Sequence, residues 1–262
     1  MKVMFVFCGG MFRSGSTLQY QVVSRLVEDS GYGQRVSWHS PSDFRRLRNQ
    51  GPYHDSIHVF KAHKLTDEMR DEIVNNGALS LTVHRDIRDV VVSAMRKNNW
   101  TFRRIWRRDR LRYWTMRFDD WSKLPNVFIC RYDELTGDLP ASIRRIGDYL
   151  GIKVGDKEVA MMAKEYNLDS QKKLVNEVAE LFKGGGLSTK YDPRSLLHYN
   201  HIASGRTGEY RSMLKPAQIR AIEYECRNWM HRWGYRPECP QMSLSQRLLR
   251  MTYGPRLFGL KH

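Results

Sequence analysis

The N-terminal segment of the chain constrains the fold more than any other part. An apolar run with high β-propensity, residues 3–8, leads into a glycine-rich turn, residues 9–16, and an amphipathic helix is expected from about Thr17 to Val27. Glycine lets the backbone approach a bound group closely, and a helix start directs N–H groups and its positive dipole end toward an anion. The segment therefore predicts a strand–loop–helix unit that binds phosphate. The alternative is a glycine-rich turn that only ends a buried strand.

The loop departs from the common nucleotide-phosphate signature G-x-x-x-x-G-K-[ST] at one position. Gly10, Gly15 and Thr17 match it, but Ser16 stands where the lysine belongs, and the cation comes earlier, at Arg13. In ATP-dependent enzymes that lysine reaches the β- and γ-phosphates. We therefore expect this loop to bind a different phosphate group.

Composition and charge narrow the class of protein. The chain has 262 residues, 41% hydrophobic and 11% aromatic, which allows one large α/β domain or two smaller ones and excludes a disordered chain. The net charge of +16 predicts an anionic partner, which includes nucleotides, nucleic acid, acidic polymers and membrane surfaces.

The cysteines and the short apolar run predict the compartment. Cys8, Cys130, Cys226 and Cys239 form no C-x-x-C pair, which argues against a zinc or thioredoxin-type site. Cys8 and Cys130 end apolar runs and are expected to be buried free thiols, which suits a reducing compartment. The N-terminal apolar run is too short to span a membrane, and no cleavage site follows it. We therefore expect a soluble, cytoplasmic protein.

Strands alternate with helices in the first half of the chain, which predicts an α/β fold. We expect a three-layer sandwich with a central parallel sheet flanked by helices, like that of P-loop nucleotide kinases. The further expected strands are residues 36–38, 57–63, 78–84 and 127–130, and the expected helices are residues 66–75, 87–95, 100–121, 140–150, 157–165, 170–182 and 216–229.

The domain organisation follows from the same pattern. We expect a single domain over residues 1–240 and a basic C-terminal tail over residues 241–262. Residues 183–212 have little periodicity, and a loop of that length predicts a cover over an active site.

Polar residues gather where the expected strands end. The glycine-rich loop, His63, Arg85 and Tyr132 each lie at or just past the end of an expected strand, and ligands of parallel sheets bind at the carboxyl ends of the strands. These residues are therefore candidates for one functional site.

Several segments, in order, resemble motifs of the sulfotransferase family that uses 3′-phosphoadenosine 5′-phosphosulfate (PAPS). The resemblance covers about residues 3–235. Its segments are Arg13-Ser14-Gly15-Ser16-Thr17, Lys61-Ala62-His63, the Arg85–Asp89–Ser93 pattern, Tyr132-Asp133-Glu134 and the stretch Gly205 to Arg211.

The resemblance implies a donor site for PAPS, with adenosine 3′,5′-bisphosphate (PAP) as product. The glycine-rich loop would hold the 5′-phosphosulfate, and Arg85 with Ser93 would hold the 3′-phosphate. The implied donor-binding residues are Arg13, Ser14, Gly15, Ser16, Thr17, Leu18, Arg85, Ser93, Tyr132, Gly205 and Arg206.

The resemblance also implies catalytic roles. His63 would be the general base that takes the proton of an acceptor hydroxyl, or less readily an amine. Lys61 and Arg13 would stabilise charge on the sulfuryl group and the bridging oxygen, without a metal ion.

Three departures from the family pattern bear on the donor site. Arg13 replaces the usual lysine, which keeps the charge but changes its geometry. Leu18 stands where a tryptophan often follows the loop, and Ala203 with Ser204 stand where basic residues are usual.

Other interpretations remain open. One alternative is a nucleotide or small-molecule kinase, which the missing loop lysine disfavours, and another is a basic protein that only binds polyanions. Without the motifs around it, His63 would be an ordinary polar histidine. The arginines between residues 103 and 112 are more typical of a solvated helix face than of a binding patch.

The expected partners follow from the chosen function. They are the nucleotide donor and a hydroxyl-bearing acceptor, with a weak preference for an acidic or carbohydrate one. No nucleic acid is expected, and membrane contact would be at most peripheral, through the basic tail. The sequence leaves the acceptor and the oligomeric state open.

Overall fold

The computed structural model describes residues 5–38, 44–45, 48–49, 56–185, 191–200, 202 and 204–239. These residues form two compact units. Unit 1 extends up to His84 and from Arg117 to Ile202, and unit 2 comprises Arg85–Met116 and the described residues from Ser204 onward.

Unit 1 is built on a five-stranded parallel sheet in the order β2-β3-β1-β4-β5. In β1 and its two neighbours, Cys8 is level with Lys61 of β3 and Leu81 of β4. The carboxyl ends of these strands therefore meet at one edge. The strands are β1 Phe5–Cys8, β2 Gly33–Trp38, β3 Ile57–Lys61, β4 Leu79–His84 and β5 Phe128–Arg131.

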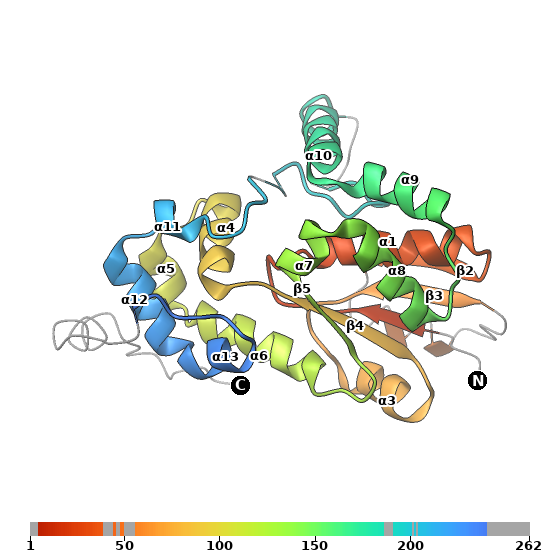
Figure 1. Cartoon of the computed structure of the whole chain (residues 1–262), viewed down its shortest axis with the longest axis horizontal. Coiled ribbons are helices and arrows are strands. Elements are labelled where there is room, and N and C mark those ends of the chain that lie inside the picture. Colours follow the sequence, from red (N-terminus) through yellow and green to blue (C-terminus); the bar gives the residue numbers. More distant parts are fainter. Residues whose placement is uncertain are drawn as a thin grey trace. The chain divides into compact units, whose positions relative to one another are not determined.

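Helices cover both faces of this sheet, because its side chains alternate between two hydrophobic cores. In β1, Val6 and Cys8 face the core shared with α1 (Ser16–Asp29), α8 (Leu139–Leu150) and α9 (Asp156–Tyr166). Figure 1 shows these helices on one side of the strands.

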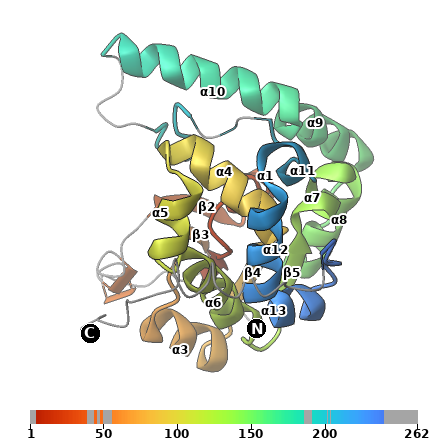
Figure 2. The ribbon, with the colours of Figure 1, turned by 90° about the vertical axis from the view of Figure 1, so that its left-hand side faces the viewer.

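The other face of the sheet has its own core. Phe5 and Phe7 of β1 pack there with Phe60, with α3 (Asp67–Asn75) and with Trp121 near the end of α6 (Arg110–Ser122). Figure 2 shows α3 from a second direction. The predicted three-layer α/β sandwich is confirmed.

Local signals explain several helix boundaries in unit 1. The Thr66 hydroxyl accepts the N–H of Met69 and so caps the start of α3. Asp138 caps α8 in the same way, and the left-handed Gly151 ends it. Two further helices are α7, Tyr132–Gly137, and α10, Leu168–Lys183.

Unit 2 is helical in the part that the structure describes. Its helices are α4 (Ile87–Asn98), α5 (Phe102–Arg107), the first part of α6, α11 (Tyr210–Met213), α12 (Pro216–Glu225) and α13 (Arg227–Arg232). None of the described helices of the chain is both long and apolar enough to cross a bilayer.

Two predicted helices are wrong in their continuity. The single helix over residues 100–121 is broken between α5 and α6, where Asp109 has a left-handed backbone with φ of 47°. Aspartate tolerates this conformation better than most residues. The helix over residues 216–229 is also interrupted, at Cys226, which ends α12 and precedes α13.

The predicted buried thiols are confirmed. Cys8, Cys130 and Cys226 are free and buried, while Cys239 is half-buried. Burial raises the pKa of the Cys130 thiol to about 12, so this sulfur stays protonated and unreactive at neutral pH.

His84 is a buried neutral histidine at the end of β4. Its side chain is 2% exposed, and its ring centroid lies 4.9 Å from that of Phe118. Burial and, to a smaller extent, the nearby Arg131 lower its pKa to about 4, although Asp133 acts in the opposite direction. Because the folded pKa lies below the unfolded one, the associated stability is complete above pH 6.5 and is lost as the pH falls toward 4.

Acidification is therefore expected to destabilise unit 1 through His84. Between pH 7.5 and pH 5, His84 should cost about 2 kcal/mol of unfolding free energy, because the unfolded chain takes up the proton first. Denaturant unfolding at both pH values, compared between the wild type and His84→Gln, measures this difference. Equal losses in the two proteins would contradict the assignment.

Candidate functional site

The glycine-rich loop between β1 and α1 has a backbone that few residues can adopt. Gly10 and Gly15 have φ of 139° and 91°, and Arg13 itself is left-handed at 63°. A Cβ on Gly15 would lie 2.7 Å from the ring of Tyr132, so the ring packs directly against the loop backbone. Glycine at position 15 is therefore required both by conformation and by space.

Ser14 shapes the loop from within. Its buried hydroxyl lies 2.6 Å from the carbonyl of Met11 and 2.8 Å from the carbonyl of Val83 in β4, and its single proton is shared between them. The N–H of Met11 also donates to Val83, at 3.1 Å. The Ser14 hydroxyl thus fixes the loop to β4 and faces the protein, so a donor contact from this residue remains a prediction.

Lys61 brings a cation to this loop from the neighbouring strand. It ends β3, its side chain is buried, and its Nζ donates to the hydroxyl of Thr17 in the first turn of α1. A bound anion at the start of α1 would balance this buried charge. The loop has no lysine at position 16, and Lys61 provides one from β3 instead. Strand β3 is adjacent to β1 in the sheet, although β2 lies between them in the sequence.

His63 contacts the glycine-rich loop nearer its start, at Gly10. It follows the end of β3, its Nδ1 lies 3.4 Å from the carbonyl oxygen of Gly10, and its ring contacts Phe12 edge-on at 6.1 Å between centroids. Its own carbonyl accepts the indole N–H of Trp121 at 3.2 Å. An Nδ1–H directed at Gly10 leaves Nε2 as the nitrogen that can accept a proton.

Unit 1 thus brings together the glycine-rich loop and three candidate residues from the ends of its strands. The glycine-rich loop contacts Lys61 through Thr17, His63 through Gly10, and Tyr132 through Gly15. The remaining unit 1 candidates, Arg13, Ser16 and Leu18, belong to the loop and the first turn of α1.

In unit 2, Arg85 is linked to the late glycine-containing segment. Arg85 follows β4 directly, is 7% exposed and donates from Nη2 to the carbonyl of Arg206 at 2.6 Å. The same nitrogen lies 3.9 Å from Oδ2 of Asp89. Arg85, Arg206 and Gly205 are therefore neighbours, while Ser93 lies in the second turn of α4.

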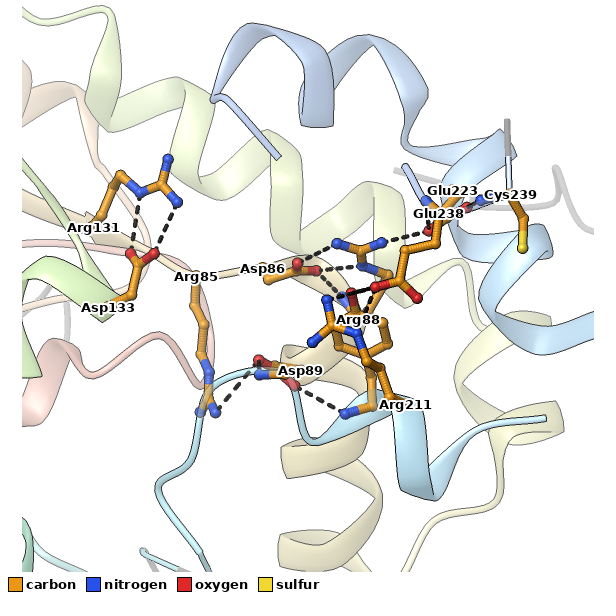
Figure 3. Close-up of polar contacts among 12 residues, drawn as sticks. Arg85, Asp86, Arg88, Asp89, Arg131, Asp133, Arg211, Glu223, Glu238 and Cys239 are labelled. Carbon is orange, nitrogen blue, oxygen red and sulfur yellow. Dashed lines mark hydrogen bonds and ion pairs between the residues drawn. The ribbon is translucent and has the colours of Figure 1, made fainter. Parts of the chain in front are cut away.

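Asp89 holds the late segment in place. Its buried carboxylate accepts the N–H of Gly208 at 2.7 Å and the N–H of Tyr210 at 3.1 Å. Figure 3 shows Asp89 beside Arg85. Burial raises the pKa of the Asp89 carboxyl, whereas Arg85 and these backbone donors act in the opposite direction. The sequence pattern included Asp89 but gave it no role.

A second buried ion cluster joins α4 to α12 and to the backbone of residues 238–239. Arg88 pairs with Asp86 at 2.6 Å and with Glu223, and Glu223 in turn accepts the N–H groups of Glu238 and Cys239 at 2.9 and 2.8 Å (Figure 3). All three charged side chains are nearly inaccessible, which makes each dependent on the others. The sequence carries no signal for this cluster, because Glu223 is 135 residues away from Arg88 and no local pattern joins them.

Ser204 forms hydrogen bonds within the segment that precedes Gly208. Ser204 donates its hydroxyl to Glu209 at 2.5 Å and accepts the N–H of Arg206 at 3.2 Å, and Glu209 pairs with Arg96. Ser204, which stands where the family usually has a basic residue, therefore folds the segment around Arg206.

The family model of the sulfotransferase domain matches residues 6–234. The chain belongs to the sulfotransferase family. It is a PAPS-dependent sulfotransferase, as the sequence predicted, and its activity is sulfuryl transfer. No curated protein sequence matches this chain.

Solved structures agree with the sulfotransferase fold. Retinol dehydratase in complex with androsterone and PAP is 17% identical, with a TM-score of 0.58, over 88% of this chain and 82% of that one. Mouse sulfotransferase SULT7A1 complexed with PAP is 17% identical, with a TM-score of 0.60, over 96% of this chain and 90% of that one. At this level of identity the similarity concerns the fold.

The described part of this sulfotransferase contains no cluster of side chains that could bind a metal ion. No group of three His, Cys, Asp or Glu side chains there is arranged to hold a metal ion. The charged groups at the loop are cations, Arg13 and Lys61, which suits an anionic donor.

Proposed function

We propose that this enzyme transfers the sulfuryl group of PAPS to an acceptor hydroxyl, with His63 as general base. The observation that carries the proposal is that Lys61 and His63 both reach the glycine-rich loop in unit 1. One provides a cation beside the first turn of α1, and the other provides a proton acceptor beside Gly10. A phosphate loop flanked in this way suits group transfer to a hydroxyl.

The loop would hold the 5′-phosphosulfate end of the donor. Helix α1 directs its positive end and first N–H groups toward the loop, and Thr17 presents its hydroxyl beside Lys61. Arg13 would add a planar guanidinium, which pairs with two oxygens at once. Gly15, Ser16 and Leu18 would contribute backbone contacts.

Sulfuryl transfer requires a group that accepts a proton and cations that stabilise negative charge. His63 would accept the acceptor's proton as the acceptor oxygen bonds to sulfur and the bond from sulfur to the bridging oxygen breaks. Lys61 would stabilise the charge on the transferring sulfuryl group, and Arg13 would stabilise the negative charge that grows on the bridging oxygen as PAP departs. Sulfuryl transfer needs mostly positioning and charge stabilisation, as phosphoryl transfer does.

Unit 2 would recognise the 3′-phosphate. Arg85 is fixed by the carbonyl of Arg206, which keeps its guanidinium in one orientation before the nucleotide binds. Ser93, Gly205 and Arg206 would complete the phosphate contacts, and Tyr132 would support the donor through its packing on Gly15.

The nucleotide specificity tests this assignment. PAP is expected to bind saturably, and Arg85→Ala should weaken it about 100-fold, because a buried charge-assisted contact to phosphate is lost. Adenosine 5′-monophosphate lacks the 3′-phosphate, so its affinity should be the same in both proteins. Isothermal titration calorimetry with both nucleotides measures this difference.

The exposed Arg227→Ala is a matched control in unit 2, and it should change neither affinity. Absence of saturable PAP binding to the wild type would refute the function itself. Equal losses for the two nucleotides in Arg85→Ala would refute only the 3′-phosphate role.

A further inference from the structure

Unit 2 has a hollow that the donor-binding residues do not use. Its volume is about 430 Å³, and its lining consists of Thr101, Arg103, Arg104, Arg107 and Arg108. All five residues are exposed, and the lining contains no acidic residue and no large apolar one. A hollow lined by four guanidinium groups favours an anionic occupant.

The hollow follows from the sequence spacing on α5. The arginines form two i,i+4 pairs, Arg103 with Arg107 and Arg104 with Arg108, so they share one side of the helix. Ile105, on the buried side, fixes the orientation of the helix because it is fully inaccessible. Like charges at this spacing destabilise a helix slightly, and a bound anion removes that cost.

Protein carboxylates do not pair with three of these arginines. Among the described residues, Arg104, Arg107 and Arg108 form no ion pair with an acidic side chain. Arg104 instead lies over the ring of Trp100, at 5.1 Å from its centroid, which limits its freedom without neutralising it. Residues 96–117 contain nine lysines and arginines and one acidic residue, Asp109.

The occupant should carry several anionic groups. One small anion can pair closely with only one or two guanidinium groups, so a single sulfate would leave the remaining charges opposed to one another. A polymer with repeated anionic groups can engage all four, and release of its counterions favours binding. Arginine forks bind sulfate and carboxylate groups with two hydrogen bonds each.

We propose that this hollow, Thr101, Arg103, Arg104, Arg107 and Arg108, binds a polysaccharide chain that bears sulfate or carboxylate groups, and thereby selects the acceptor class. The selection of acceptors rests on the proposed function, because such a polymer also carries the hydroxyls that sulfuryl transfer requires. A polymer can occupy the hollow while another of its sugar units is the one modified.

The lining distinguishes this occupant from other anionic partners. Binding of single-stranded nucleic acid relies on aromatic side chains that stack with bases, and the lining has none. Phe102 and Trp106 stack on each other instead, at 5.8 Å between centroids. A lipid surface is bound by apolar side chains together with cations, and the lining lacks apolar side chains as well.

Binding of a heparin dodecasaccharide to the full chain tests the proposal. The double variant Arg107→Ala/Arg108→Ala should weaken heparin binding about tenfold. The slope of log Kd against log salt concentration should fall by about two. The control Lys153→Ala/Lys157→Ala removes the same charge from exposed positions of unit 1 and should change Kd less than about twofold. Fluorescence anisotropy between about 50 and 200 mM salt gives both quantities.

Binding of two other anionic ligands shows whether the hollow prefers a polysaccharide. Single-stranded DNA of equal charge and vesicles containing phosphatidylserine should bind more weakly than heparin, with similar losses in the two double variants. The proposal is overturned if both double variants lose heparin binding equally. It is also overturned if DNA or vesicles bind more tightly than heparin and depend on Arg107 and Arg108.

Titration of PAP into the same samples separates this inference from the proposed function. PAP affinity should be equal in the wild type and in both double variants. If heparin binding depends on the hollow but the wild type does not bind PAP, the polysaccharide site stands and the proposed function fails. If PAP binds but heparin affinity does not depend on Arg107 and Arg108, only the inference fails.

Discussion

His63→Ala is expected to lower the rate of sulfuryl transfer at least about 100-fold while PAP affinity changes less than about threefold, because general-base catalysis acts on the acceptor's proton and not on the nucleotide. The rate is measured with labelled PAPS and two acceptor probes, de-O-sulfated heparin and 2-naphthol. PAP affinity is measured by calorimetry. A loss confined to turnover would place His63 at the reacting hydroxyl.

The pH dependence gives a second readout for His63. In the wild type, turnover should fall toward acidic pH as the imidazole becomes protonated, and His63→Gln should lack this acidic limb. His231→Ala, which removes an exposed histidine of α13, is the control and should change turnover less than about twofold. If His63→Ala retains most of the wild-type rate, His63 is not the base.

Asp89→Ala is expected to weaken PAP binding at least about tenfold, because the carboxylate fixes the segment that holds Arg206 and, through it, Arg85. Two buried backbone N–H groups, those of Gly208 and Tyr210, lose their acceptor. Truncating one member of a buried charged network should also destabilise unit 2 by about 3 kcal/mol. Adenosine 5′-monophosphate should bind as it does to the wild type.

Hydrogen exchange separates this positioning role from general loss of stability. The amides of Gly208 and Tyr210 should exchange faster in Asp89→Ala, while those of β1 and β3 should keep their protection. Asp89→Asn retains one oxygen acceptor and should lie between the wild type and the alanine variant. Unchanged PAP affinity together with fast exchange at Gly208 would show that the segment has no part in nucleotide binding.

The layers of the fold were predictable because β1 carries both signals in a few residues. Its alternation of Phe5 and Phe7 with Val6 and Cys8 fits two buried faces, and the glycine-rich turn behind it predicts the helix that follows. The break at Asp109 was not predictable, because the apolar spacing continues across it and a single left-handed residue leaves no periodic signal.

The site was predictable as a set of residues but not as a set of contacts. The expected strand over residues 57–63 included both Lys61 and His63, yet β3 ends at Lys61 and His63 lies beyond it, where strand alternation no longer applies. Ser14 reads as a phosphate ligand in the motif, but its hydroxyl is directed to Val83, a contact that depends on the strand order of the sheet.

The packing of the Tyr132 ring against Gly15 limits which substitutions can be accepted at these two positions during evolution. The ring occupies the space that any side chain at position 15 would need, so a change at either position is tolerated only if the other position permits it. Residues 15 and 132 are thus expected to be inherited as a pair, although 116 residues separate them. Variation at position 132 across relatives would then report indirectly on the shape of the phosphate loop.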